Sequence, residues 1–328
     1  MATGTSPVDA AAGGEGDAAA RDASAPNPGE PNPAANWLLH ILQLRQLSAT
    51  EFEGDNERPG EGASEQPKGG RLFGGQVVAQ ALRAASLTVA AEGAVGHSPR
   101  DAHSLHAYFL RGGDPGVPVR FAVETLTDGR SFSARRVTAR QRDAVILTLD
   151  ASFHAREDGL VHQEPMPEVP PPEALPDDYR VERLHERPGF ANLSMRRRPF
   201  TLRSVYATHE RARDEDFQWN PVWVRFDAVA PNDDALARCL LAYASDMGIV
   251  STGAIPHRVS REALSMASLD HALWIHRPVP IDEWLLFAKR TVVAAHGRVL
   301  NRATFYRRDG EVVASCSQEG VMRLRRER

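Results

Sequence analysis

Three polar residues in the second half of the chain are of types that could hold and activate one water molecule. Asp246 ends an apolar, helix-forming segment, Ser268 begins a strand-like run, and Gln318 lies near the end of another such run. A carboxylate within hydrogen-bond reach of a water can take its proton as a general base. A hydroxyl and a neutral amide can orient the same water, because each can donate and accept. The three residues predict a catalytic trio if the fold brings them together.

Each of the three also has a purely structural interpretation. Asp246 would lie at the negative end of a helix dipole, where a carboxylate is unfavourable and could lean into solvent or bond nearby backbone. By strand alternation Gln318 shares the inward face of Cys316, and there it could satisfy loop backbone. Serine at the start of a strand commonly bonds local backbone, and Ser268 has no GxSxG motif around it that would favour a nucleophilic serine.

An internal repeat favours the catalytic interpretation. SLHAYFLR from Ser104 and SLDHALWIHR from Ser268 begin two similar successions of strand-like segments. In this alignment Ser104 corresponds to Ser268 and Phe153 corresponds to Gln318. The helix predicted in the first copy contains no acidic residue that could correspond to Asp246. Polar residues found in only one copy therefore indicate where the site lies.

Other polar residues are predicted to be structural. Asp270 and His271 are adjacent on a strand, so they point to opposite faces and cannot easily act on one atom. His103 and His106 are interpreted as framework histidines. Cys316 is expected to be a small core residue, because nothing basic beside it would favour the thiolate.

The elements that must position these residues follow from hydrophobic spacing. Residues 74–90 predict a helix with a small, alanine-rich face, whose start at Gly74–Gln76 packs closely or offers N–H groups to an oxygen. Residues 233–248 predict the corresponding helix, with Asn232 or Asp233 as N-cap and Gly248 as C-cap. Strand-like segments follow each helix. We therefore predict an α+β double hot-dog fold, in which each of two tandem antiparallel sheets wraps around a long helix.

Composition defines the ranges of the two copies. Residues 1–35 contain no Leu, Ile, Phe, Trp or Tyr and are predicted to be a disordered tail. We expect an N-terminal hot-dog domain over 36–160, a proline-rich extended linker over 161–194, and a C-terminal hot-dog domain over 195–328 that carries the trio. An apolar helix is expected from Trp37, and a loop over 53–70.

Charge and cysteine content exclude several classes of function. The formal net charge of −4 argues against a general nucleic-acid binder. No apolar run is long enough to span a membrane, and the N-terminus lacks the pattern of a secretory signal. The two cysteines are not arranged as a disulfide scaffold or a structural zinc site. We expect a cytoplasmic protein without a metal.

Seven ordered motifs resemble the acyl-CoA thioesterase II family: RLFGGQVVAQAL, HSLHAYFLRGGDP, ETLTDGRSFSARRV, LAYASD, SLDHALWIHRP, DEWLL and SQEGVMR. The likeness covers roughly residues 36–325. It implies a double hot-dog fold, hydrolysis of acyl-CoA to free acid and CoA without metal or cofactor, and a homo-oligomer, either dimer or tetramer. The family's catalytic Asp, Thr or Ser, and Gln fall on Asp246, Ser268 and Gln318. The chain has serine where some members have threonine, and it lacks a peroxisomal C-terminal tripeptide.

The mechanism expected from this resemblance is direct attack of water on the thioester carbonyl, with Asp246 as base and backbone N–H groups stabilising the oxyanion. Two alternatives remain: an enoyl-CoA hydratase on the same fold, and a non-catalytic acyl-CoA-binding module. The sequence leaves open the preferred acyl chain length, the residues that meet the CoA phosphates and the oligomeric order.

Overall fold

The computed structural model describes residues 32–56, 70–93, 99–178, 198–205, 219–229, 232–257, 259 and 263–325. Residues Asn32–Arg328 form one compact unit. The helical segments are α1 (Pro33–Ile41), α2 (Gly74–Gly93), α5 (Asp234–Ser245), α6 (Ile249–Thr252), and the short 3₁₀ segments η1 (Pro172–Ala174) and η3 (Ile255–His257). None of the helices in these ranges combines the length and apolar character needed to cross a membrane.

A single 13-stranded antiparallel sheet runs through both halves of this unit. In the first half its order is β1-β2-β4-β5-β6-β3, and in the second half β10-β13-β12-β11-β8-β7, with β9 paired to β13. The first-half strands are β1 (Arg45–Gln46), β2 (Glu51–Gly54), β3 (Arg100–Phe109), β4 (Val119–Asp128), β5 (Phe132–Gln141) and β6 (Ala144–Ala155). Those of the second half are β7 (Phe200–Ser204), β8 (Trp219–Phe226), β9 (Leu264–Ser268), β10 (Asp270–Ile275), β11 (Leu285–Ala295), β12 (Arg298–Tyr306) and β13 (Val312–Leu324).

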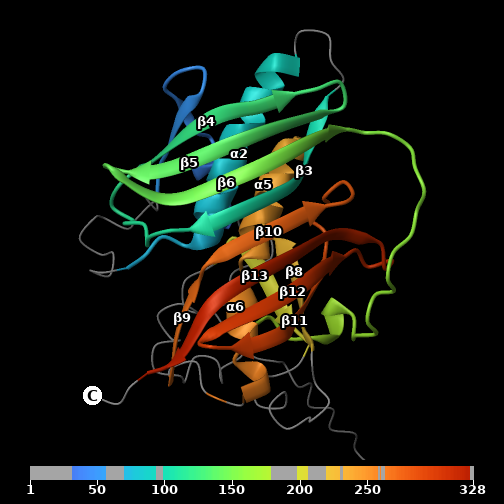
Figure 1. Cartoon of the computed structure of the whole chain (residues 1–328). Helices are drawn as coiled ribbons and strands as arrows, with labels where there is room; N and C mark the ends of the chain where they lie inside the picture. The colour runs from blue at the N-terminus through green and yellow to red at the C-terminus, as the bar shows by residue number, and fades with distance from the viewer. Residues whose placement is uncertain are drawn as a thin grey trace, which may run out of the picture. The chain divides into compact units, whose positions relative to one another are not determined.

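Strands β3 and β10 join the two halves at the centre of the sheet, and Leu105 lies opposite Leu273. Figure 1 shows α2 behind the first-half strands β4, β5 and β6, with α5 beside it, passing behind β6 and β3 towards β10. Helix α2 packs on the first-half strands, and α5 packs on α2 and on the central strands β3 and β10, so each half contributes one long helix and one set of antiparallel strands. This arrangement confirms the predicted double hot-dog fold.

The two long helices pack against each other in opposite directions. Gly75 at the start of α2 contacts Asp246 just after α5, and Arg83 further along α2 pairs with Asp233 at the start of α5. Small side chains allow this close approach, since Ala81 and most other residues of the α2 face are fully buried. The hydrophobic core is continuous across both halves. A site between the helix ends therefore draws residues from both copies.

The N-cap of α5 is one of the two residues predicted for it, whereas its C-cap differs from the predicted residue. Asp233 is the N-cap, and its carboxylate accepts the N–H of Leu236 at 3.0 Å. The predicted C-cap at Gly248 is wrong, because α5 ends at Ser245 with Asp246 as its C-cap. Gly248 has φ +70° and instead precedes α6, where the left-handed backbone suits glycine.

Equivalent hydrogen bonds define how the two halves correspond. The carbonyl of Ile146 accepts the N–H groups of Leu110 and Arg111, and the carbonyl of Val313 accepts those of His276 and Arg277 in the same way. The guanidinium of each arginine also donates to the preceding carbonyl, that of Val145 or Val312.

This equivalence corrects the alignment drawn from the sequence. The spacing from Arg111 to Arg277 places Ala102, and not Ser104, at the position of Ser268. The spacing from Ile146 to Val313 places Ala151, and not Phe153, at the position of Gln318. The similar SL pairs misled the alignment, because Ser104–Leu105 lies after the bulge of the first copy, whereas Ser268–Leu269 leads into the bulge of the second. The first copy therefore has alanine at both positions.

Two predicted boundaries also need correction. Helix α1 begins at Pro33, with Asn32 as its N-cap and Ala35 fully buried, so 32–35 belong to the folded part and not to a tail. The helix ends at Ile41 and two strands follow it, so the loop predicted from residue 53 begins only after β2. The other predicted tail residues, 1–31, and residues 57–69 of the loop lie outside the described residues.

The first part of the proline-rich segment lies against the second half. Its residues Met166, Val169 and Leu175 pack on a small apolar cluster formed by β8, β11 and β12. The indole N–H of Trp223 donates to the carbonyl of Pro170 at 2.9 Å. The segment is thus fixed to the sheet as well as connecting the copies. Residues 179–194 of the predicted linker lie outside the described residues, and the predicted domain ranges as a whole stay a prediction.

Candidate active site

The structure brings Asp246, Ser268 and Gln318 into one hydrogen-bonded group. The side-chain amide of Gln318 donates from Nε2 to Asp246 Oδ1 at 2.6 Å and to Ser268 Oγ at 3.0 Å. Asp246 is 8% exposed and Gln318 is fully buried. The three residues come from the end of α5, the end of β9 and the middle of β13. The predicted convergence is therefore observed, while the catalytic role of each residue stays a prediction.

The side-chain amide of Gln318 hydrogen-bonds to both Asp246 and Ser268, and its carbonyl oxygen is left to accept a further hydrogen bond. Both hydrogens of its amide nitrogen are donated within the group, which leaves the carbonyl oxygen Oε1 as its remaining acceptor. Within the described ranges Oε1 is buried and has no hydrogen-bond partner. A buried acceptor without a partner is unfavourable by about 1–3 kcal/mol. A ligand that donates a hydrogen bond to Oε1 would therefore suit this site.

Burial changes the acid strength of Asp246. Removal from water raises the pKa of its carboxyl from 3.8 to about 6, while the hydrogen bonds from Gln318 and from the Gly75 N–H act in the opposite direction. Desolvation disfavours the charged form of the carboxyl, and here it outweighs the two hydrogen bonds that favour that form. A carboxylate with a pKa of about 6 is ionised at neutral pH and is a stronger base than an exposed aspartate. This suits general-base catalysis.

The first copy supplies part of the site through the start of α2. The backbone N–H of Gly75 donates to Asp246 Oδ2 at 2.7 Å. A Cβ added at Gly74 would lie 2.8 Å from the same oxygen, and one at Gly75 would lie 2.6 Å from the carbonyl oxygen of Tyr243. Glycine is therefore required for this approach. The close packing predicted for Gly74–Gln76 is confirmed, and the Gly75 N–H is directed to the carboxylate.

Asp270 and His271 lie on opposite faces of β10, as predicted. His271 is buried, and its Nε2 lies 2.8 Å from the hydroxyl of Ser245, the residue before Asp246. Burial lowers the pKa of His271 to about 4, so the ring is neutral. The carboxylate of Asp270 instead accepts the N–H of Glu319 at 2.7 Å. Both residues contact neighbours of the trio, which inspection of single motifs did not indicate.

The remaining predicted framework residues lie outside the trio. His103 Nε2 lies 2.8 Å from the hydroxyl of Ser152, and His106 packs its ring edge-on against Trp274. Cys316 is buried, and burial raises the pKa of its thiol, so it is a core residue as expected.

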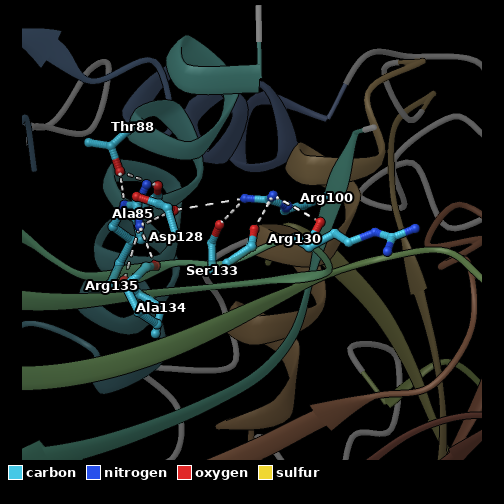
Figure 2. A network of polar contacts seen from close by, with 10 residues as sticks. Ala85, Thr88, Arg100, Asp128, Arg130, Ser133, Ala134 and Arg135 are labelled. Carbon is cyan, nitrogen blue, oxygen red and sulfur yellow. Dashed lines mark hydrogen bonds and ion pairs between the residues drawn. The ribbon is translucent and has the colours of Figure 1, made fainter. Parts of the chain in front are cut away.

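The first copy has a different polar group near its own helix. Arg135 of β5 is fully buried, and its guanidinium donates to Thr88 Oγ1 of α2 at 3.0 Å and to Asp128 Oδ1 at 2.9 Å. Arg100 donates to Ser133 Oγ at 2.5 Å and lies 3.9 Å from Asp128. Figure 2 shows the guanidinium of Arg135 directed at Thr88 and Asp128, with Arg100 on the other side of Asp128. This network ties the β4–β5 hairpin to α2.

Comparison with known protein families agrees with the fold. Residues 63–154 match the model of an acyl-CoA thioesterase N-terminal domain, and residues 198–321 match that of an acyl-CoA thioesterase. Acyl-CoA thioesterase 2 of Haemophilus influenzae is 34% identical over 295 residues, which cover 88% of this chain and 98% of that protein. Acyl-coenzyme A thioesterase 8 of Mus musculus is 37% identical over 79% of this chain and 82% of its own length.

Solved structures show the same arrangement. The crystal structure of an acyl-CoA thioesterase II from Mycobacterium marinum has a TM-score of 0.70 and 32% identity, and covers 89% of this chain and 99% of that one. A hot-dog protein of unknown function from Alicyclobacillus acidocaldarius, at 20% identity, has a TM-score of 0.65 over 88% of this chain and 99% of its own.

The fold defines a double hot-dog protein, and the buried acid–amide–hydroxyl group is a candidate site between the start of α2 and the end of α5. The chain belongs to the acyl-CoA thioesterase II family.

Proposed function

We propose that this chain hydrolyses fatty acyl-CoA to free fatty acid and CoA, and that Asp246, Ser268 and Gln318 hold the attacking water. The family membership and the named relatives support the reaction. The observation that carries the site assignment is the hydrogen bonding of the amide of Gln318 to both Asp246 and Ser268. Among the described residues the carbonyl oxygen of this amide has no hydrogen-bond partner, so it can accept a hydrogen bond from water.

The proposed reaction begins with proton transfer to Asp246. Water donates one O–H to the ionised carboxylate and the other to Gln318 Oε1, and its oxygen attacks the thioester carbonyl carbon. The resulting oxyanion collapses, the carbon–sulfur bond breaks, and the CoA thiolate takes the proton from Asp246, which restores the ionised carboxylate. The products are the carboxylic acid and CoA, and no covalent enzyme intermediate is formed. The Gly75 N–H is already donated to Asp246, so the oxyanion takes its hydrogen bonds from other donors.

Free-thiol release by the Asp246→Asn variant tests this assignment. The amide cannot take the proton of water, so we expect kcat to fall by about 10²–10⁴-fold while the protein stays folded. Ala102→Ser, at the first-copy position of Ser268, is the matched control and should keep wild-type kcat. A folded D246N protein with near wild-type turnover would show that the role assigned to Asp246 is wrong.

The substrate itself distinguishes the alternatives. A series of acyl-CoA substrates of increasing chain length should release thiol and define the preferred length. Hydration of enoyl-CoA without thiol release would identify a hydratase, and binding without either reaction would identify a non-catalytic module. The opposite orientations of Asp270 and His271 do not favour the Asp/His pair that a hydratase would need.

We further propose that the protein is cytoplasmic, acts as a homo-oligomer, either dimer or tetramer, and needs neither metal nor cofactor. The composition and the family resemblance support these proposals. Size-exclusion chromatography with light scattering would test the oligomeric state, and activity after exhaustive chelation would test the independence from metal.

A further inference from the structure

The strand that ends at Ser268 is interrupted by a bulge directly beside the trio. Along β13, Gly320 pairs with Ser268 of β9, and Ser317 pairs with Ala272 of β10. The β9–β10 side therefore has one residue more than the β13 side over this interval. A bulge of this kind re-aims the neighbouring side chains, and bulges are over-represented next to active sites.

The backbone groups of Glu319 are bonded by the two residues of the bulge. Its carbonyl accepts the N–H of Leu269 at 2.9 Å, and its N–H donates to the carboxylate of Asp270 at 2.7 Å. Asp270 thus supplies from its side chain the acceptor that the interrupted backbone ladder does not. Leu269 is held from the other side as well, because its carbonyl accepts the N–H of Phe109 in β3.

Glu319 follows Gln318, whose amide joins Asp246 and Ser268. A shift of Glu319 would move the Cα of Gln318, and with it the donor at 2.6 Å from Asp246 and at 3.0 Å from Ser268. Errors of about 1 Å in the position of such groups can reduce rates by about 100-fold. The side chain of Asp270 points away from the core face on which Gln318 lies, so it acts through the backbone and not on the reacting atoms.

The first copy has a bulge at the corresponding place but a different residue in it. The register of β3 and β6 shifts between Ala102 and Ser104. By the spacing of Arg111 and Arg277, Ser104 corresponds to Asp270. The carboxylate bonded to the strand backbone is thus a feature of the copy that carries the trio.

We propose that Asp270 is a positioning residue for thioester hydrolysis, which fixes the β9–β10 bulge through the N–H of Glu319 and so holds Gln318 against Asp246 and Ser268. The proposal rests on the proposed role of the trio. In this proposal the effect on kcat depends on the position of the acceptor oxygen relative to the backbone, and not on the charge of the carboxylate.

The variants Asp270→Asn and Asp270→Glu separate geometry from charge. Asn keeps an acceptor oxygen at the same distance and loses the charge, so we expect kcat within about threefold of wild type. Glu keeps the charge on a side chain that is one methylene longer, so we expect kcat to fall about 10–100-fold with KM within about threefold. Ser104→Ala is the matched change in the first copy and should leave both constants unchanged. Thermal unfolding of each variant shows whether the protein is folded.

Any other pattern for the two variants overturns the proposal. A D270E protein with wild-type kcat shows that the position of the acceptor is unimportant, and a D270N protein with strongly reduced kcat shows that the charge is required. In a Gln318→Ala background D270E should lower kcat no further, since its effect passes through Gln318, and a full additional loss would contradict this route.

Asp246→Asn, assayed beside these variants, separates the two proposals. An active, folded D246N would overturn the role of the trio and this proposal with it. An inactive D246N together with a fully active D270E would overturn the positioning role alone.

Discussion

The two copies of the hot-dog fold differ in how a buried charge beside a helix is compensated. In the second copy the carboxylate of Asp246 takes its hydrogen bonds from a neutral amide and a backbone N–H, while Arg238 of α5 is buried against Asp101. In the first copy the guanidinium of Arg135 is bonded to the carboxylate of Asp128 and the hydroxyl of Thr88. The same architecture therefore keeps one buried charge compensated by an opposite charge and leaves the other to neutral donors.

This difference separates a structural polar group from the proposed reactive one. The buried guanidinium of Arg135 has the opposite charge of Asp128 beside it. A buried carboxylate with only neutral donors has a raised pKa and accepts a proton readily, as the value of about 6 for Asp246 indicates. The first copy contributes the start of α2, and the second contributes the proposed proton acceptor.

The strongest test of this division is Gln318→Ala. The substitution removes the amide that bonds Asp246 and Ser268, so we expect kcat for thiol release to fall by about 100-fold or more. The matched change is Ala151→Ser at the corresponding first-copy position, which should lower stability slightly and leave kcat unchanged. Equal losses of kcat in the two variants would mean that the copies are not functionally distinct.

The next largest effect is expected on stability, from Arg135→Met. Methionine fills a similar volume but leaves Asp128 and Thr88 without their guanidinium donor, and breaking a buried pair in this way is destabilising by about 3–5 kcal/mol. Because Asp128 is partly exposed, a loss at the lower end of this range is expected in urea unfolding. The kcat of the folded protein should stay within about twofold of wild type. A large loss of kcat without loss of stability would assign Arg135 to catalysis instead.

The pH dependence of the second copy follows from its carboxylate. Ionised Asp246 is the proposed base, so kcat/KM should fall about tenfold for each pH unit below about 6 and be level above it. Folding raises the pKa of Asp246, so its ionisation weakens the folded state as pH rises from 3.8 to about 6, and the effect is then constant.

The stability of the Asp246→Asn variant is a second, independent test of the raised pKa of Asp246. The variant lacks the buried charge and should be more stable than wild type at pH 8, by at most about 3 kcal/mol. The difference should disappear near pH 4, where the wild-type carboxyl is protonated. Urea unfolding at the two pH values measures this, and a variant that is less stable at pH 8 would contradict the raised pKa.

The elements that form each copy could largely be predicted from the sequence, because they depend on local patterns of residues. Apolar spacing predicted both long helices, and the observed N-cap Asp233 is one of the two candidates predicted before α5. The correspondence of the copies was misjudged by two residues on the strands of Ser268 and Gln318. The serine–leucine pairs look alike in the sequence, but Ser268–Leu269 leads into a bulge and Ser104–Leu105 follows the corresponding one, which only the strand pairing reveals.

Contacts between the copies could not be predicted in this way. The bond from the Gly75 N–H to Asp246 joins residues that are far apart in the chain, and it depends on the antiparallel packing of α2 on α5. The role of Asp270 likewise depends on the register of β13 against two strands. Sequence motifs indicated which residues come together at the candidate site, and tertiary packing decides how they are held.

The smallest expected effect concerns the hydroxyl of Ser268. Its Oγ accepts one hydrogen bond, from Gln318 at 3.0 Å, and such a bond contributes about 1 kcal/mol. Ser268→Ala should therefore lower kcat by about fivefold, and Ser268→Thr, which keeps the hydroxyl, should stay within about twofold of wild type. Steady-state thiol release compares the two variants, and a threonine variant as impaired as the alanine variant would show that the volume of the side chain matters here and not its hydroxyl. The corresponding residue of the first copy, Ala102, has no hydroxyl. If S268A kept wild-type kcat, Ser268 would no longer count among the functional differences between the copies, and Asp246 and Gln318 alone would remain as the proposed reactive pair.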